Sequence, residues 1–471
     1  MKLRIILLSV AALLTTGCTM GPRYKRPTVA VPGSYRGEAP ERDHPQPQNT
    51  APQIVPLGEE KWWDIFQDEQ LRTLIRTALK QNYDLRIAAS RVLEAQAQLG
   101  ITRADQFPTL SGGGAIADVR SSQSKLVPEF ETSTGQVNVS AAWALDFWGQ
   151  FRRATEAARA NLLASEWARQ EVVSTLVANV ASAYFQLRAL DLQLEISRRT
   201  LDSRRESLRL TRMLADGGAT SLLDVRQAEQ LVFTASAEVP VLEQQIEQQE
   251  NFLSILLGQN PGDVPRGQTL TEQRQPPEVP SGLPSALLER RPDIRQAEEQ
   301  LIAANAEIGV ARAAYFPQIS LSATSGFQSS ALSNLFTGPA GAWSFGASLA
   351  QPIFTGGRLR SGVRLAEARE QTALLVYQQS IQGAFRSVSD ALVAYRKTRE
   401  FRVQEELLFV SAQDAARLSH MRYTGGVTGY LEVLTNETNA FAAELALVQA
   451  RQNELLALVQ LYEALGGGWQ Q

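Results

Sequence analysis

The side chains that most often carry catalytic or metal chemistry are scarce in this sequence. The chain has one cysteine, Cys18, and two histidines, His44 and His420, among 471 residues. A single cysteine cannot form an intrachain disulfide, and neither histidine has a metal-ligand partner at a useful spacing. The triple glycine at 112–114 is not followed by the helical Lys-Ser/Thr element of a phosphate-binding loop. The sequence therefore predicts a protein that is not an enzyme and that uses no metal and no cofactor.

Charge and composition narrow the class further. The chain carries 46 Lys and Arg residues against 49 Asp and Glu residues, which gives a formal net charge of −3. This balance lacks the basic footprint of a nucleic-acid-binding protein, so we expect no nucleic-acid partner. The hydrophobic content of 44% is compatible with an extensive core and is not that of a disordered chain.

Cys18 lies directly behind a segment that reads as an export signal. Residues 1–17 combine a positively charged start, an apolar run at 5–14 and small residues before Cys18, which is typical of a secretory signal peptide. The apolar run is too short to cross a membrane as a helix. Cys18 follows Gly17 and resembles the cysteine of a bacterial lipobox, although Thr15 stands where a leucine is usual. The resemblance implies lipidation of Cys18, and an ordinary signal peptide with a stray cysteine is the alternative.

The rest of the chain is an extended strap followed by an internal repeat of about 208 residues. The strap, residues 18–58, would be lipid-anchored and is rich in Pro, Gly and polar residues without apolar periodicity. Repeat 1 spans residues 59–258, and repeat 2 spans residues 259–471. The segments that match are 84–111 with 293–320 and 213–229 with 421–437. Each repeat is predicted to hold strands, at about 108–148 and 317–355, and then a coiled-coil hairpin, at about 150–257 and 358–465.

Two long antiparallel helices are predicted in each hairpin. Residues 150–216 contain no Gly and no Pro, which would give about 100 Å of helix at 1.5 Å per residue. Apolar residues recur every seven positions along this helix and along the helix that returns, as in a coiled coil. In repeat 2 the pattern is interrupted at Arg402. The turns are predicted at two glycine pairs, which fit the left-handed C-cap of a helix: Gly217-Gly218 and Gly425-Gly426.

The predicted strands alternate apolar and polar residues, with aromatic residues near their ends. Residues 137–147, 319–328 and 343–349 follow this pattern, which is typical of an outer-membrane β-barrel. A sheet with one buried face in water gives the same alternation, and the export signal favours the membrane. Four strands cannot close a membrane barrel, which needs about eight or more, and lipid does not tolerate unpaired edges. Three chains around a cyclic axis would supply twelve strands.

These features resemble the outer-membrane factors of Gram-negative tripartite efflux pumps, the TolC-like exit ducts. The resemblance is closest to the lipidated branch that partners resistance-nodulation-division pumps, and it covers nearly all of the chain after the signal peptide. The motifs that carry it are Arg290-Arg291-Pro292-Asp293-Ile294, Ala311-Arg312-Ala313-Ala314-Tyr315-Phe316-Pro317, Pro352-Ile353-Phe354 and Ala464-Leu465-Gly466-Gly467-Gly468-Trp469.

The resemblance implies a mainly α-helical protomer with a transmembrane β part. A homotrimer would form a 12-stranded β-barrel in the outer membrane on a 12-helix α-barrel in the periplasm. It would be a passive exit duct for drugs or other toxic small molecules, and its partners would be outer-membrane lipid, a periplasmic membrane-fusion adaptor and an inner-membrane resistance-nodulation-division pump. A duct for type I protein secretion and a metal-ion efflux duct share this architecture and remain alternatives. A periplasmic adaptor would need a lipoyl-like domain, which the sequence lacks.

The resemblance also implies a constriction at the second hairpin tip, where the family closes its periplasmic end. Leu431 would form an apolar ring and Glu432 an acidic ring facing the lumen. Thr435 stands where relatives often have an aspartate. The two glycine turns would dock the adaptor.

A latch next to this constriction follows from the same resemblance. Tyr423 matches a family tyrosine that bonds an aspartate of the neighbouring hairpin, and Asp224 occupies that aspartate position. Arg422 would supply a further link. The alternative is that Asp224 and Glu432 are solvated charges at helix ends and that Tyr423 packs within its hairpin.

Overall fold

The computed structural model describes residues 19–36, 57, 61–120, 131–273 and 284–469. The predicted signal peptide, Cys18 and much of the predicted strap lie outside the described residues. The described helices are α2 (Trp62–Ile65), α3 (Glu69–Gln81), α4 (Tyr83–Ala104), α5 (Gln150–Asp216), α6 (Leu222–Leu256), α7 (Pro284–Arg290), α8 (Pro292–Ala313), α9 (Arg358–Thr424) and α10 (Tyr430–Ala464). The described strands are β1 (Thr109–Arg120), β2 (Glu131–Leu145), β3 (Gln318–Ser329) and β4 (Gly341–Ala350).

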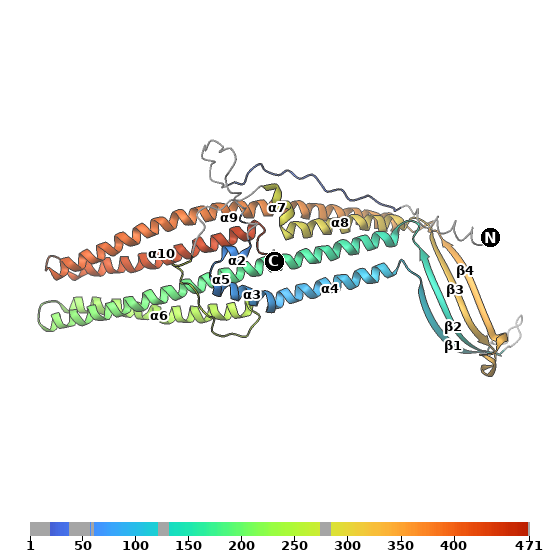
Figure 1. The fold of residues 1–471 in the computed structure, drawn as a ribbon, viewed down its shortest axis with the longest axis horizontal. Helices are drawn as coiled ribbons and strands as arrows, with labels where there is room; N and C mark the ends of the chain where they lie inside the picture. Colours follow the sequence, from blue (N-terminus) through green and yellow to red (C-terminus); the bar gives the residue numbers. More distant parts are fainter. Residues whose placement is uncertain (1–18, 37–56, 58–60, 121–130, 274–283, 470–471) are drawn as a thin grey trace. The chain divides into compact units, whose positions relative to one another are not determined.

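The element order repeats once along the chain (Figure 1). In each half a 22-residue helix precedes two strands, and a 67-residue helix and a 35-residue helix follow them. The chain divides into two compact units. The first holds residues 91–166 and 296–378 with the strap up to residue 28, and the second holds the remaining residues. The predicted mainly helical fold with a smaller β part is confirmed.

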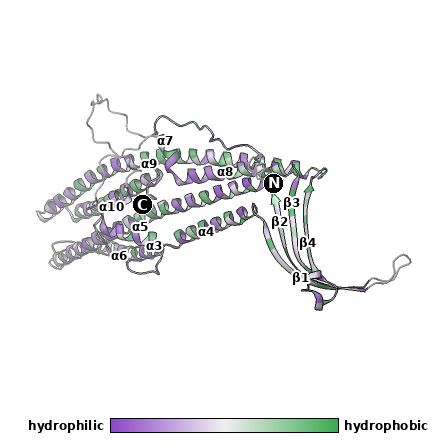
Figure 2. Cartoon of the chain, turned by 45° about the vertical axis from the view of Figure 1, so that its right-hand side comes forward, coloured by the Kyte–Doolittle hydropathy of each residue, from purple (hydrophilic) through white to green (hydrophobic). Residues whose placement is uncertain are grey.

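The first unit contains one antiparallel sheet of four strands in the order β1-β2-β3-β4. Residues that face each other across antiparallel strands point to the same side of the sheet. The register pairs Trp143 with Leu321 and Val137 with Phe327. It also pairs Ala323 with Phe345. The apolar residues of neighbouring strands therefore share one face, and Figure 2 shows apolar and polar residues alternating along these strands.

The opposite face of the sheet is lined by small and polar side chains. Ser140 lies opposite Ser111, and their hydroxyl oxygens are 2.8 Å apart. Ser320 and Ser348 form a second such pair at 2.7 Å. On the apolar face Trp343 and Phe345 are exposed. The two faces of this sheet therefore suit different environments, one polar and one apolar.

The second unit is built from two long helical hairpins, α5 with α6 and α9 with α10. Most of the predicted seven-residue pattern is buried in them: Val173, Val180, Leu187, Leu201 and Leu208 on α5, Val225, Val232, Ile246 and Leu253 on α6, Ile381, Val388 and Tyr395 on α9, and Val448, Leu455 and Tyr462 on α10. Leu194, Val239 and Phe409 are partly buried. The apolar seam between antiparallel helices is the main contact that holds each hairpin together.

The interruption of the pattern at Arg402 has a counterpart on the facing helix. The Arg402 Nε lies 2.5 Å from Oε2 of Glu454, whose side chain is 1% exposed. A second ion pair joins Arg402 Nη1 to Glu406 at 2.9 Å. Removal of one partner from such a pair would leave a buried charge uncompensated, which is costly. Arg402 is therefore a polar position in the α9–α10 seam.

The closing motif of the chain packs on the motif at residues 290–294. Arg291 donates from Nη1 to the carbonyl of Ala464 at the end of α10, at 2.9 Å, and pairs with Asp293 at 2.6 Å. Trp469 Nε1 donates to the Arg290 carbonyl at 3.2 Å. Gly466 adopts a φ of 77° after the helix, a conformation that side chains disfavour. These two sequence motifs are thus one structural contact.

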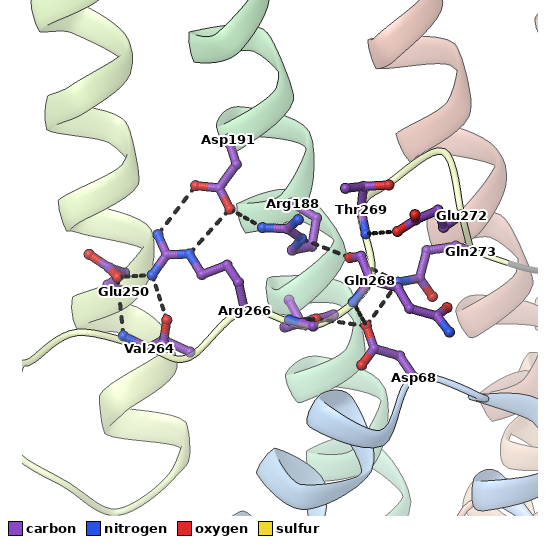
Figure 3. A network of polar contacts seen from close by, with 12 residues as sticks. Asp68, Arg188, Asp191, Glu250, Val264, Arg266, Gln268, Thr269, Glu272 and Gln273 are labelled. Atoms are coloured by element: carbon purple, nitrogen blue, oxygen red, sulfur yellow. Dashed lines mark hydrogen bonds and ion pairs between the residues drawn. The ribbon is translucent and has the colours of Figure 1, made fainter.

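A polar network centred on Asp68 holds the loop that joins the two repeats (Figure 3). The Asp68 carboxylate caps α3 by accepting from the amides of Gln70 and Leu71. It also accepts from the Tyr184 hydroxyl at 2.7 Å and from the amide of Gln268 at 2.9 Å. Burial acts to raise the pKa of Asp68, but these hydrogen bonds outweigh it and hold the pKa below its usual value.

The same loop is held a second time through Arg266 (Figure 3). Its guanidinium contacts both carboxylate oxygens of Asp191 on α5, at 3.2 and 3.3 Å, and also the Glu250 carboxylate on α6. Asp191 in turn pairs with Arg188 at 2.6 Å. One arginine of the connecting loop therefore links both helices of the first hairpin.

We expect Asp68→Ala to destabilise the protein by about 3 kcal/mol, because it removes a helix cap and leaves buried donors unpaired. Because the pKa of Asp68 is lowered in the fold, this stabilisation is present at neutral pH and is lost as pH falls below the ordinary carboxyl range. The apparent melting temperature of the detergent-solubilised protein, followed by circular dichroism, measures the effect. Glu69→Ala is the control, since Glu69 makes exposed ion pairs, and an equal loss in both variants would contradict the role of Asp68.

Candidate functional site

The two hairpin tips turn by the same backbone geometry. The amide of Gly217 donates to the Met213 carbonyl, and that of Gly425 donates to the Met421 carbonyl. The second glycines, Gly218 and Gly426, have φ values of 75° and 71°. The left-handed cap predicted for these turns is therefore observed at the second glycine of each pair, where a side chain would be strained.

An equivalent threonine and acid follow each turn. The acid belongs to a side-chain cap of α6, whereas Gly429 at the N-cap of α10 has no side-chain cap hydrogen bond. In the first hairpin Asp224 accepts from the hydroxyls of Thr220 and Ser221 and from the Ser221 amide, which forms a capping box. The Thr220 hydrogen bond is the main cause that lowers the pKa of Asp224. In the second hairpin the Thr428 hydroxyl donates to Glu432 at 2.5 Å. Asp224 and Glu432 are thus equivalent acids at the starts of α6 and α10.

The structure joins the predicted latch residues in a different combination. Arg422 pairs with Glu432 of its own hairpin, with Nε 3.1 Å from Oε1. The Tyr423 ring packs edge-on against Tyr430, with ring centroids 5.5 Å apart. Between the described atoms of Tyr423 and Asp224 there is no hydrogen bond. In this chain Arg422 and Glu432 are brought together, and Asp224 serves the helix cap.

The predicted constriction residues lie at the start of α10, and their side chains are exposed or partly exposed. Leu431 is 60% exposed. Thr435 is exposed, and its hydroxyl donates to the Leu431 carbonyl at 2.9 Å. The Glu432 side chain is partly exposed beside Arg422. Leu431, Glu432 and Thr435 therefore lie within the first two turns of one helix.

An apolar cluster between the two hairpins is a feature that the sequence patterns did not reveal. Tyr430 and Val433 of α10 are buried against residues of the first hairpin: Leu201, Leu208, Val225, Ala228, Val232 and Ala235. Arg204 of α5 lies beside it, buried, with its guanidinium carbon 5.0 Å from the centre of the Phe441 ring. Heptad spacing marks the contacts inside a hairpin, but nothing in the sequence says which turn of one hairpin meets the other.

The described residues include neither a candidate metal site nor a helix suited to span a membrane. No group of three or more His, Cys, Asp or Glu side chains in this part of the chain is arranged to hold a metal ion. None of its helices combines the length and hydrophobicity needed to cross a membrane.

A sheet with one apolar and one hydroxyl-lined face, joined to long paired helices with glycine tips, defines a TolC-like outer-membrane channel protein. The chain belongs to the outer membrane efflux protein family, whose model matches residues 74–259 and 283–467. One match falls in each half of the chain. The family resemblance drawn from the sequence is thereby confirmed.

Individual relatives cover almost the whole chain. The cation efflux system protein CusC of Escherichia coli O6:H1 is 36% identical over 461 residues, 98% of each chain. The probable efflux pump outer membrane protein TtgC of Pseudomonas putida KT2440 is 37% identical over 476 residues, 99% of this chain and 96% of that protein. Among solved structures, the open state of the Neisseria gonorrhoeae MtrE outer membrane channel has a TM-score of 0.86 at 32% identity, covering 96% of this chain and 99% of that one.

Proposed function

We propose that this protein is the outer-membrane channel of a tripartite efflux pump of the resistance-nodulation-division type. It acts as a passive exit duct, without catalysis of its own, and receives its cargo from a periplasmic adaptor and an inner-membrane pump. The observation that carries this proposal is the two-faced sheet of a chain that belongs to the outer membrane efflux protein family. An apolar face suits lipid, and a face of serine hydroxyls suits a water-filled lumen.

The proposed assembly is a homotrimer. Within the described chain, β1 pairs only with β2, and β4 pairs only with β3. The free edges of β1 and β4 carry backbone N–H and C=O groups that lipid cannot satisfy. Pairing β4 of one copy with β1 of the next around a threefold axis closes twelve strands and removes every edge. The hairpins of the three copies would then form the periplasmic α-barrel.

The residues of the proposed lumen do not specify one class of cargo. Serine hydroxyls on the lumen face offer weak, unspecific hydrogen bonds, so the duct itself selects little. The relatives include a cation efflux protein and a probable efflux pump protein at nearly equal identity. We favour drugs or other toxic small molecules as cargo, and metal cations are the second candidate, supported by the similarity to CusC.

We also propose that Cys18 anchors the protein to the outer membrane by lipid. The residues that follow it are docked at the junction of β2 and α5: the Met20 amide donates to the Trp148 carbonyl at 3.1 Å. Arg153 is buried and donates to the carbonyls of Met20 and Pro22, at 3.2 and 3.0 Å. A lipid on Cys18 would therefore start near the end of a strand, where the proposed barrel leaves the membrane.

Cysteine substitution on the two faces of β3 tests the duct. We expect a charged thiol reagent to lower the single-channel conductance of Ser322→Cys in planar bilayers, because this side chain faces the lumen. The matched variant Leu321→Cys, on the lipid face, should keep its conductance, and Cys18→Ser is the background for both. In cells, modified Ser322→Cys should sensitise the host to antibiotics and toluene, or to metal cations if the second candidate is correct. Equal responses of both variants would contradict the duct.

Metabolic labelling with palmitate tests the anchor. We expect label on the wild-type protein and none on Cys18→Ser, because no other cysteine is present. Thr19→Ala should keep the label and controls for a general effect on processing. An unlabelled wild-type protein in the outer membrane would rule out the lipid.

The latch between Tyr423 and Asp224 remains a proposal for the closed trimer. Tyr423→Phe removes the hydroxyl and keeps the ring on Tyr430. A hydrogen bond to a carboxylate contributes about 1.5–3 kcal/mol, so its loss should raise the open fraction in planar bilayers about tenfold or more. Tyr430→Phe is the neighbouring control. Asp224→Asn is preferred to Asp224→Ala as the partner variant because it keeps an acceptor for the helix cap, and unchanged gating in Tyr423→Phe would exclude the latch.

A further inference from the structure

The two hairpins carry equivalent glutamates in different surroundings. Glu229 on α6 and Glu437 on α10 are 208 residues apart, which is the repeat shift at the tips. Each lies two turns beyond the start of its helix, behind the glycine turn. Glu229 and Glu437 can therefore be compared directly, because they occupy equivalent positions in the two repeats and have different neighbours.

Glu229 is held by two arginines of its own hairpin. Arg212 Nη2 lies 2.7 Å from Oε1, and Arg226 Nη1 lies 2.6 Å from Oε2. The hydrogen bonds from Arg212 and then Arg226 hold the pKa of Glu229 below its usual value. This carboxylate therefore stays ionised and paired at any pH above the ordinary carboxyl range.

Glu437 has neither of these arginines as a neighbour in its own hairpin. The position equivalent to Arg212 is occupied by His420, and the position equivalent to Arg226 by Leu434. None of the hydrogen bonds or ion pairs between described residues involves the Glu437 carboxylate. Burial raises its pKa, and the charges of His420 and Arg204 offset this only in part.

Arg204 brings a charge of the first hairpin to this glutamate. It lies on α5, is 4% exposed, and donates from Nη1 to the Leu231 carbonyl of α6 at 3.1 Å. Its guanidinium stacks over Phe441 of α10, while its Nε is buried without a partner. The charges of Glu437 and of the Tyr430 phenol act on it. Val232 and Ala235 of α6 belong to the apolar cluster that joins the two hairpins.

We propose that the partly buried Glu437, one turn along α10 from the Phe441 ring that Arg204 of the first hairpin covers, positions the second hairpin against the first in a pH-dependent manner, whereas the doubly paired Glu229 keeps the first hairpin insensitive to pH. The proposal rests on the proposed function, in which the second hairpin is the moving part of the periplasmic gate. Glu437, Arg204 and His420 are positioning residues, since they act through the packing of the hairpins.

The direction of the pH effect follows from burial. When the hairpins part, the Glu437 carboxyl meets water and its pKa returns towards the ordinary value of 4.5. The packed state therefore binds this proton more tightly, so packing is fully favoured at low pH and weakens as pH rises through the raised pKa. The charge of His420 lowers the pKa of the Glu437 carboxyl and so limits the effect. Glu229 has the opposite shift, and its contribution is lost only below that range.

Single-channel recordings of the full trimer between pH 5 and pH 8 test the proposal. We expect the open fraction of the wild type to rise severalfold with pH, because the packed state binds the Glu437 proton more tightly than the parted state. Glu437→Gln, which imitates the protonated form, should stay closed at every pH. The double variant His420→Arg with Leu434→Arg, which restores the arginines of the first hairpin, should also lose the pH response. Glu229→Gln is the control and should keep it.

A wild-type pH profile in Glu437→Gln would overturn the proposal. A protein without conductance at any pH would contradict the proposed function instead. In that event amide hydrogen exchange of residues 430–441 in the solubilised protein still tests the role of Glu437. The wild type and Glu437→Gln are compared at the same pH. Greater protection in Glu437→Gln at pH 8, vanishing at pH 5, is the supporting result, and equal protection at both pH values would refute it.

Discussion

The hydrogen-bonding groups on the outer edges of β1 and β4 are the constraint on which the proposed assembly depends. Among the described strands, β2 and β3 are paired on both sides, whereas β1 and β4 have a neighbour on one side only. In water such an edge would be covered by solvent, whereas in lipid it must be paired. The two-faced sheet and the long hairpins therefore make sense together as one third of a closed ring.

The internal repeat gives the chain two hairpins with helices of equal length, but the two have different charges at their seams. The first is fastened by full ion pairs, as at Glu229 with its two arginines. The second keeps the turn and the length, but α10 has no side-chain cap, and the charge of Arg204 from the other hairpin acts on its Glu437. If the two hairpins of each protomer were identical, nothing would favour movement of the second hairpin over movement of the first. The absence of two arginines beside Glu437 gives the second hairpin a different charge environment from that of the first.

The sequence predicted those parts of the fold that depend on local periodicity. The heptads of α5 and α6 predicted buried positions such as Val180 and Leu253, and the glycine pairs predicted the turns, because these features need only near neighbours in the chain. The role of Arg402 and the Arg204 contact to Phe441 could not be predicted, since each joins segments far apart in sequence. The first tip is a different case, because Asp224 is predicted from the resemblance as the partner of Tyr423, whereas its neighbours Thr220 and Ser221 make it part of a helix cap. The local spacing of Ser221 and Asp224 is a signal that could have indicated this cap.

Buried charges are a costly way to hold helices together, and their positions here suggest what they are for. An apolar seam would hold α9 to α10 at lower cost than Arg402 with Glu454. A uniform apolar heptad, however, lets antiparallel helices slide by one repeat, because every register buries similar side chains. The ion pair of Arg402 with Glu454 disfavours these shifted registers, because sliding would leave each buried charge without its partner. For a duct whose tips must meet partners at a defined length, register matters more than the last increment of stability.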